Sequence, residues 1–162
     1  MSRTTLNLDG LTKMRAKLKT AIRTAVYETA EIIREDAKAR APRDTEALAE
    51  SIYVTTTASS DYNQCRSNAE SKFNSARSSG KTPKGRRIGP NETLDMIEET
   101  RPEDPDEAWV ICGVAYGNNI ENSATNPQPF ITPAVMDNKR TLTDKIRKAM
   151  DGLSVKGKIT RR

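Results

Sequence analysis

The stretch AKARAPRDTEALAESIYVTTT, residues 37–57, contains the transitions that decide the fold. It begins as the last part of a helix, and Pro42 ends that helix because the residue before a proline is pushed out of the α region. Residues 45–50 then form a short helical turn. Residues 51–57 are β-branched and aromatic, a composition that favours a strand. The stretch therefore predicts a helix, a proline break, a helical turn and a strand in succession.

Upstream of this stretch, one long helix is predicted over residues 9–40. Its apolar residues recur at steps of three and four and form a single stripe: Leu11, Met14, Leu18, Ile22, Ala25 or Val26, Thr29, and Ile32 or Ile33. The charges run against the helix dipole, because basic residues dominate the first half and acidic residues the second. A long helix with these features is typical of one that packs against other subunits. Packing along its own sheet explains the stripe equally well.

Downstream, residues 58–107 form a long polar stretch that we interpret as a large insertion. Loops of this length are usually functional or disordered. Five residues in it nevertheless keep helical spacing and predict a helix over residues 61–77: Tyr62, Cys65, Ala69, Phe73 and Ala76. Asn91 is a candidate cap for a second short helix that runs to Glu99. A basic loop, residues 81–87, lies between the two.

The last third of the chain contains a strand and a helix. Residues 108–115 are almost continuously apolar, which predicts a strand that is central in its sheet. Residues 116–126 form a loop with one helical turn. A final helix is predicted over residues 133–150 with Pro133 at its first position, and its apolar face holds Ala134, Val135, Leu142, Ile146 and Ala149. The basic tail, residues 152–162, is expected to be mobile.

The composition predicts one domain with a thin core. The chain has 162 residues, 35% of them hydrophobic and 4% aromatic, and a formal net charge of +5. The charges are segregated: residues 66–87 are basic and residues 92–107 acidic, so they can pair within the chain or between neighbouring copies. The two cysteines are expected to be reduced thiols. No signal peptide and no membrane-spanning segment are expected.

No catalytic, cofactor or metal site is predicted, and the protein is not expected to be an enzyme. The sequence has no histidine, no Gly-rich loop that could hold a phosphate, and no metal-ligand spacing. Its carboxylate pairs, such as Glu35–Asp36 and Glu98–Glu99, are adjacent in sequence. Their side chains therefore diverge and cannot flank one substrate bond.

Three stretches, in this order, resemble the phage tail-completion family (minor tail, lambda Z-like). Residues 37–52 resemble its signature "aka-APvdTGaL-xxSI", with Glu46 in the place of the usual glycine. Residues 113–121 resemble "yA-xx-vEfGT", although residues 122–124 replace the "fGT". The sequence PQPFITPA, residues 127–134, resembles "aqPFlrPA" and is the closest of the three.

The resemblance implies an α+β subunit in which a long N-terminal helix and a C-terminal helix pack on a small antiparallel sheet. It further implies a structural virion protein, made in the host cytoplasm, of which about six copies form a ring in the phage neck. The expected partners are a head-side connector or stopper protein, a tail terminator or tail tube protein, and genomic DNA that passes through without sequence-specific binding. The polar insertion is expected to become ordered only in the assembled ring.

Two alternatives stay open at this point. One is a small basic nucleic-acid-binding protein, whose affinity would fall steeply with salt. The other is a neighbouring ring of the neck, the tail terminator or the head-closure protein.

Candidate interface residues are few. Phe130, which follows Pro129, is either an anchor at a subunit interface or, as we favour, a core residue that fixes the last helix. Glu121 pairs with a basic residue of the next copy or lies in solvent. Trp109 belongs to the core or to the boundary of an interface. The loop cations contact DNA or, as we favour, the acidic segment of a neighbour: Lys84, Arg86 and Arg87.

Overall fold

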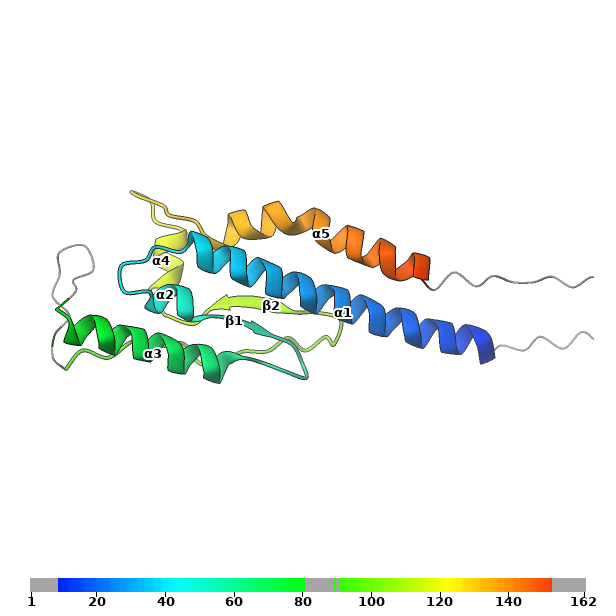
Figure 1. The fold of residues 1–162 in the computed structure, drawn as a ribbon, viewed down its shortest axis with the longest axis horizontal. Helices are drawn as coiled ribbons and strands as arrows, with labels where there is room; N and C mark the ends of the chain where they lie inside the picture. Colours follow the sequence, from blue (N-terminus) through cyan, green and yellow to red (C-terminus); the bar gives the residue numbers. More distant parts are fainter. Residues whose placement is uncertain (1–8, 81–88, 90, 153–162) are drawn as a thin grey trace, which may run out of the picture.

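The computed structural model describes residues 9–80, 89 and 91–152 (Figure 1). The elements are, in chain order, α1 (Asp9–Arg40), α2 (Ala47–Glu50), β1 (Ile52–Thr55), α3 (Tyr62–Ser78), β2 (Trp109–Cys112), α4 (Gly117–Glu121) and α5 (Ile131–Gly152). The predicted bounds of the first helix agree with those of α1. The predicted basic loop, residues 81–87, and all but the first residue of the basic tail lie outside the described residues.

The architecture is α+β and mostly helical, as predicted. The helices α1 and α5 run antiparallel and side by side, and α1 lies between α5 and the two-stranded sheet (Figure 1). The sheet is antiparallel, with Ile52 opposite Cys112 and Thr55 opposite Trp109. The helix α3 covers the sheet on the side away from α1.

The main core lies where α1, α2, α4 and the start of α5 meet. It includes Leu48, Ile52, Val114 and Phe130 together with four alanines, among them Ala37, all of them buried. The buried apolar residues of α1 are alanines. Because a methyl side chain takes little space, these positions let the sheet and α5 approach the helix backbone closely.

The outer edge of β1 is closed by the turn into α3. The Asp61 carboxylate accepts the Val54 N–H at 2.7 Å, and the Cys65 thiol donates to the Ile52 carbonyl at 3.4 Å. An unpaired strand edge is a site of aggregation, so these contacts protect it. Burial raises the pKa of the Cys65 thiol to about 11, and neither cysteine forms a disulfide.

The helix predicted from Asn91 to Glu99 is absent, and this prediction was wrong. The segment is extended: Met96 forms an isolated β-bridge with Val114, and the Ile97 N–H donates to the Gly113 carbonyl at 2.8 Å. Leu94 and Met96, two residues apart, both pack against the main core. Their spacing fits the period of a strand rather than that of a helix.

The strand β2 is not central in its sheet, which corrects a second prediction. The sheet has two strands among the described residues, and β2 is only half covered. The central position falls just after it. There the Gly113 N–H donates to the Ser51 carbonyl. On the other side of the chain, the Gly113 carbonyl accepts the Ile97 N–H, and the Ala115 N–H donates to the Asp95 carbonyl.

The helix α3 packs against other elements of its own chain; that the insertion becomes ordered only in an assembled ring stays a prediction. All five residues of its predicted apolar stripe are buried, and α3 contacts β1 and α2. The stripe is therefore the face with which α3 packs on the rest of the chain. The last helix also begins earlier than predicted, at Ile131, so that Pro133 lies inside its first turn.

Of the described helices, none has the length and apolar character to span a membrane.

Candidate interaction surface

The first turns of α1 extend beyond the end of α5 (Figure 1). The two helices are antiparallel and Lys145 pairs with Glu28, so Ala149 near the end of α5 lies about level with Thr24, and both line one pocket between the helices. Residues 10–17 are all exposed. We call residues 10–19 the arm tip. Lys19 forms an ion pair with Asp106 at 3.9 Å, and Leu18 is half-buried. A helix of about ten residues is marginal in water on its own, so the exposed arm tip gains from further contacts.

The arm tip combines apolar and basic side chains. Leu11 is 58% exposed and Met14 is 37% exposed, and with Leu18 they keep the i, i+3, i+7 spacing of one helix face. Arg15 and Lys17 flank this face on opposite sides, and Lys13 lies on the far side of the helix. Within the described part of the chain none of the three forms an ion pair. Large exposed apolar residues with a charged border are typical of a protein interaction site.

An open apolar groove of about 430 Å³ lies along the middle of α1. Its floor is α1, and its walls are β2 and α5; the lining includes Val26, Ala30, Ile33, Trp109, Val135 and Leu142. Trp109 and Val135 are 40% and 42% exposed. The groove is therefore an apolar surface that the chain leaves uncovered.

One border of this groove is acidic. Residues 103–107, which we call the acidic loop, precede β2, and the Glu107 carboxylate accepts the Trp109 indole N–H at 3.1 Å. Asp106 anchors the loop to α1 through Arg23 at 2.7 Å. The hydrogen bond from Arg23 holds the pKa of Asp106 below its usual value. Part of the acidic segment, residues 92–107, is thus paired within the chain, here with α1.

Glu121 has a structural position that neither sequence alternative described. One oxygen accepts the backbone N–H groups of Phe130 at 2.7 Å and Ile131 at 3.1 Å, and the other accepts that of Thr132 at 2.8 Å. Burial acts to raise the pKa of Glu121, but these hydrogen bonds outweigh it and the pKa is lowered. Glu121 therefore caps α5 from α4, and it satisfies N–H groups that a helix start leaves unpaired.

Glu46 adopts a left-handed backbone conformation, with φ of 61°. It is the only described non-glycine residue with positive φ. The resemblance places a glycine at this position, and glycine is the residue that this conformation favours. The turn joins α1 to α2, and the Glu50 N–H donates to the Glu46 carbonyl at 3.0 Å.

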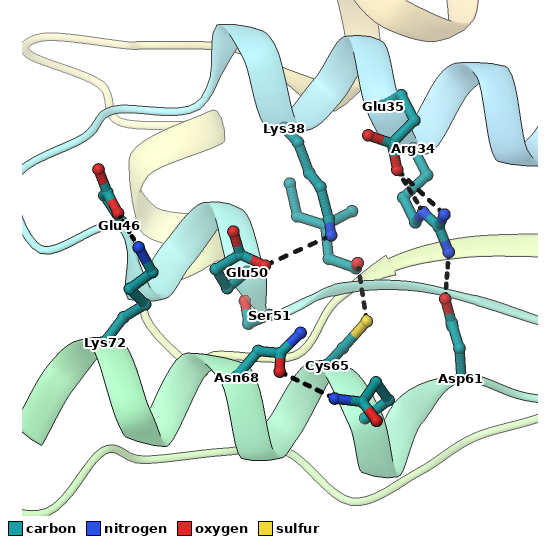
Figure 2. Close-up of polar contacts among 12 residues, drawn as sticks. Arg34, Glu35, Lys38, Glu46, Glu50, Ser51, Asp61, Cys65, Asn68 and Lys72 are labelled. Carbon is teal, nitrogen blue, oxygen red and sulfur yellow. Dashed lines mark hydrogen bonds and ion pairs between the residues drawn. The ribbon is translucent and has the colours of Figure 1, made fainter.

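Ion pairs fix α3 and α2 against α1 at the end opposite the arm tip. Figure 2 shows these contacts: Arg34 with Asp61, Lys38 with Glu50, and Lys72 with Glu46. Each such pair contributes at most about 1 kcal/mol when partly exposed, so their main effect is on the placement of the helices.

The predicted interface residues do not form one surface. Phe130 is fully buried in the main core, while Pro129 beside it is exposed. Trp109 alone among them lines the groove. Lys84, Arg86 and Arg87 lie outside the described residues. The sequence analysis did not predict that the arm tip and Val135 are exposed. The reversed charges and the long apolar stripe of α1 were the features from which the exposed arm tip could have been predicted.

Comparison with known protein families gives a match over the first half of the chain. Residues 7–81 match the HK97-gp10-like family model, described as "Bacteriophage HK97-gp10, putative tail-component". The match covers α1, α2, β1 and α3, and it contains the first of the three stretches that resemble a tail protein family. The resemblance to a phage tail protein family is thereby confirmed. No curated protein and no solved structure matches the chain significantly. The family description is that of a phage tail component.

Proposed function

We propose, from the match to this phage tail-component family, that the chain is a structural protein of the neck. In this proposal, about six copies form a ring that joins the head connector to the tail tube and surrounds the passage of DNA. Each copy acts by binding alone. The single observation that carries the proposal is that the matched region includes an arm tip whose apolar and basic residues the chain leaves uncovered.

The two ends of the molecule support a role as a subunit. One end has a closed core fixed by ion pairs, and the other ends in a projecting helix (Figure 1). A thin core with a long exposed helix is typical of a protein that buries further surface on assembly. The proposed partners are other copies of the chain, a head-side connector or stopper protein, and a tail terminator or tail tube protein.

We further propose that DNA passes through the ring without sequence-specific binding. Several of the cations that give the chain its positive charge are engaged by carboxylates within it. Arg23 pairs with Asp106, and Arg40 pairs with both Asp36 and Asp137. A cation held in this way is less available for a phosphate, whose contact releases counterions and dominates nucleic-acid affinity.

Two measurements test the proposal together. Light scattering and averaged electron micrographs of the purified protein give its mass and shape, and mass spectrometry of intact virions shows whether the chain is part of the particle. A closed ring, or presence in the neck of virions, is the expected result. Absence from purified virions would overturn the proposal. DNA affinity that falls with salt at a log–log slope of about −0.9 per phosphate would favour the nucleic-acid alternative.

A further inference from the structure

We propose that the arm tip of one copy docks in the apolar groove of the next copy, with Leu11, Met14 and Leu18 against the groove and its cations beside the acidic loop. The inference rests on the proposed function, because it names the contact through which copies would form a ring. Both surfaces are left uncovered by the chain itself.

The arm tip cannot reach the groove of its own chain. Both belong to one continuous helix, because Val26 and Ala30 of α1 form part of the groove floor. Met14 precedes Ala30 by 16 residues, which corresponds to about 24 Å along a straight helix. A rigid helix cannot fold back onto its own middle, so the arm tip can fill this groove only in another copy.

The shapes of the two surfaces are compatible. Three large side chains on one face of a helix are the usual anchors when a helix lies in an apolar groove. The groove is open along α1 and has walls of different kinds, a strand edge at Trp109 and a helix at Val135. Docking would cover Leu11 and Met14 together with Trp109 and Val135, all of which are among the large apolar residues that the single chain exposes.

Charge complements the docked arm tip along the β2 side of the groove. Lys13, Arg15 and Lys17 give the tip a positive charge, and the acidic loop gives the β2 side of the groove a negative charge. The α5 side carries Lys139, which lies between Val135 and Leu142 at helical spacing. Arg15 and Lys17 flank the apolar face of the tip on opposite sides, so one of them faces the acidic loop whichever way the docked helix runs. Opposite charges of this kind set register and increase the rate of association more than they add affinity.

The contact joins two different surfaces, so it is heterologous. Each copy offers one arm tip and one groove, and the copies therefore associate head to tail. Such contacts generate a closed ring when the rotation between copies closes, and an open filament when it does not. A contact between identical arm tips would instead stop at a dimer.

A pair of cysteine variants tests this arrangement. The M14C and V135C proteins are prepared separately, mixed, and oxidised at high concentration and in assembled particles. The native Cys65 and Cys112 are buried or half-buried, so the unmodified chain serves as the background. We expect a disulfide-linked dimer in the M14C and V135C mixture, and none in either variant alone. The control is a mixture of M14C with M136C, because Met136 is exposed on α5 but does not line the groove.

The possible outcomes separate the contact from the function. A dimer in M14C alone would show that arm tips meet each other, and would overturn the inference. A link no stronger than that of the M136C control would overturn it as well. If rings form without the M14C–V135C link, this contact is wrong while the neck proposal stands. If the link forms but virions lack the protein, the neck proposal fails while the contact stands.

Discussion

The two ends of the molecule differ in how much of their apolar surface the chain itself covers. At the end that contains α2 and α4, Phe130 and Ile52 are fully buried. At the other end, Leu11 of α1 and Met150 of α5 are more than half exposed. The helices α1 and α5 run through both ends (Figure 1), so the difference arises from side chains and neighbours rather than from the type of element.

The size of the apolar residues on α1 shows what this difference means. Where the helix meets the core, its buried apolar residues are alanines, such as Ala37. Where it projects, its apolar residues are Leu11 and Met14, which are larger and more hydrophobic. Burial of a side chain of this size is worth about 1.5–3 kcal/mol. The chain thus leaves two large apolar side chains of α1 where another molecule can cover them, while stability comes from the opposite end.

The largest expected effect tests directly whether stability comes from the main core rather than from the arm tip. Phe130→Ala should lower the free energy of unfolding by about 3–5 kcal/mol, because it leaves a cavity in the closed core. Met14→Ala should change it by less than about 0.5 kcal/mol, because Met14 lies on an exposed surface. Urea unfolding followed by circular dichroism measures both. Equal losses of unfolding free energy from the two substitutions would show that the arm tip contributes as much to stability as the main core.

The second prediction concerns the link between α4 and α5. Glu121→Gln should destabilise the protein by about 1–2 kcal/mol at neutral pH, because a charged acceptor of three N–H groups is replaced by a neutral one. Hydrogen bonding lowers the pKa of Glu121 in the folded state. Its contribution is therefore complete above the ordinary pKa of 4.5 and is lost as the pH falls through the lower folded value.

The difference in stability between wild type and Glu121→Gln should consequently shrink below about pH 4.5. Urea unfolding at several pH values measures it. The control is Glu98→Gln, an exposed carboxylate on the extended segment before β2. A difference that stayed constant with pH would show that the carboxylate charge does not stabilise the start of α5.

Periodic features of the fold could be predicted from the sequence, and pairings at a distance could not. The bounds of α1 and the buried stripe of α3 follow from apolar residues at steps of three and four, which local geometry alone imposes. The extended segment at Met96 was missed because its conformation depends on hydrogen bonds to Gly113, a tertiary contact. Short apolar runs carry no signal that separates a strand from a helix.

The surfaces were predictable to a smaller extent. The reversed charges of α1 predicted contacts with other subunits, and the arm tip exposes part of these charges. The position of Glu121 was not predictable, because its three bonds reach nine to eleven residues along the chain and depend on how α4 meets α5. The exposed side of Trp109 follows from the small number of strands, since a third strand beside it would have buried it.

A smaller effect is expected at the turn between α1 and α2. Glu46→Gly should be more stable than Glu46→Ala by about 1 kcal/mol, because the left-handed conformation strains any residue with a Cβ atom. Both substitutions remove the ion pair with Lys72, so the comparison isolates the backbone. Thermal unfolding of the two variants measures the difference. Equal stability of the two variants would mean that the left-handed conformation of residue 46 is not strained.

The smallest effect on stability is expected at the arm tip, where it should oppose the effect on assembly. Arg15 precedes Lys19 by four residues, so the two cations repel each other on one face of α1. Arg15→Glu replaces this repulsion with attraction and improves the match to the helix dipole, which should stabilise the monomer by about 0.3–0.5 kcal/mol. The same change places a carboxylate beside the acidic loop of the neighbouring copy and should weaken association. Arg15→Gln, which removes the charge only, should lie between the two.

Thermal unfolding of the monomer and light scattering of the assembled protein measure these opposite trends on the same variants. If Arg15→Glu were more stable and assembled as well as wild type, the basic arm tip would have no role in association. If it were both less stable and less assembled, the charge would act on the helix itself. A more stable monomer with weaker assembly is the result that supports the inference. It would show that the cations of the arm tip destabilise α1 but strengthen its contact with another molecule.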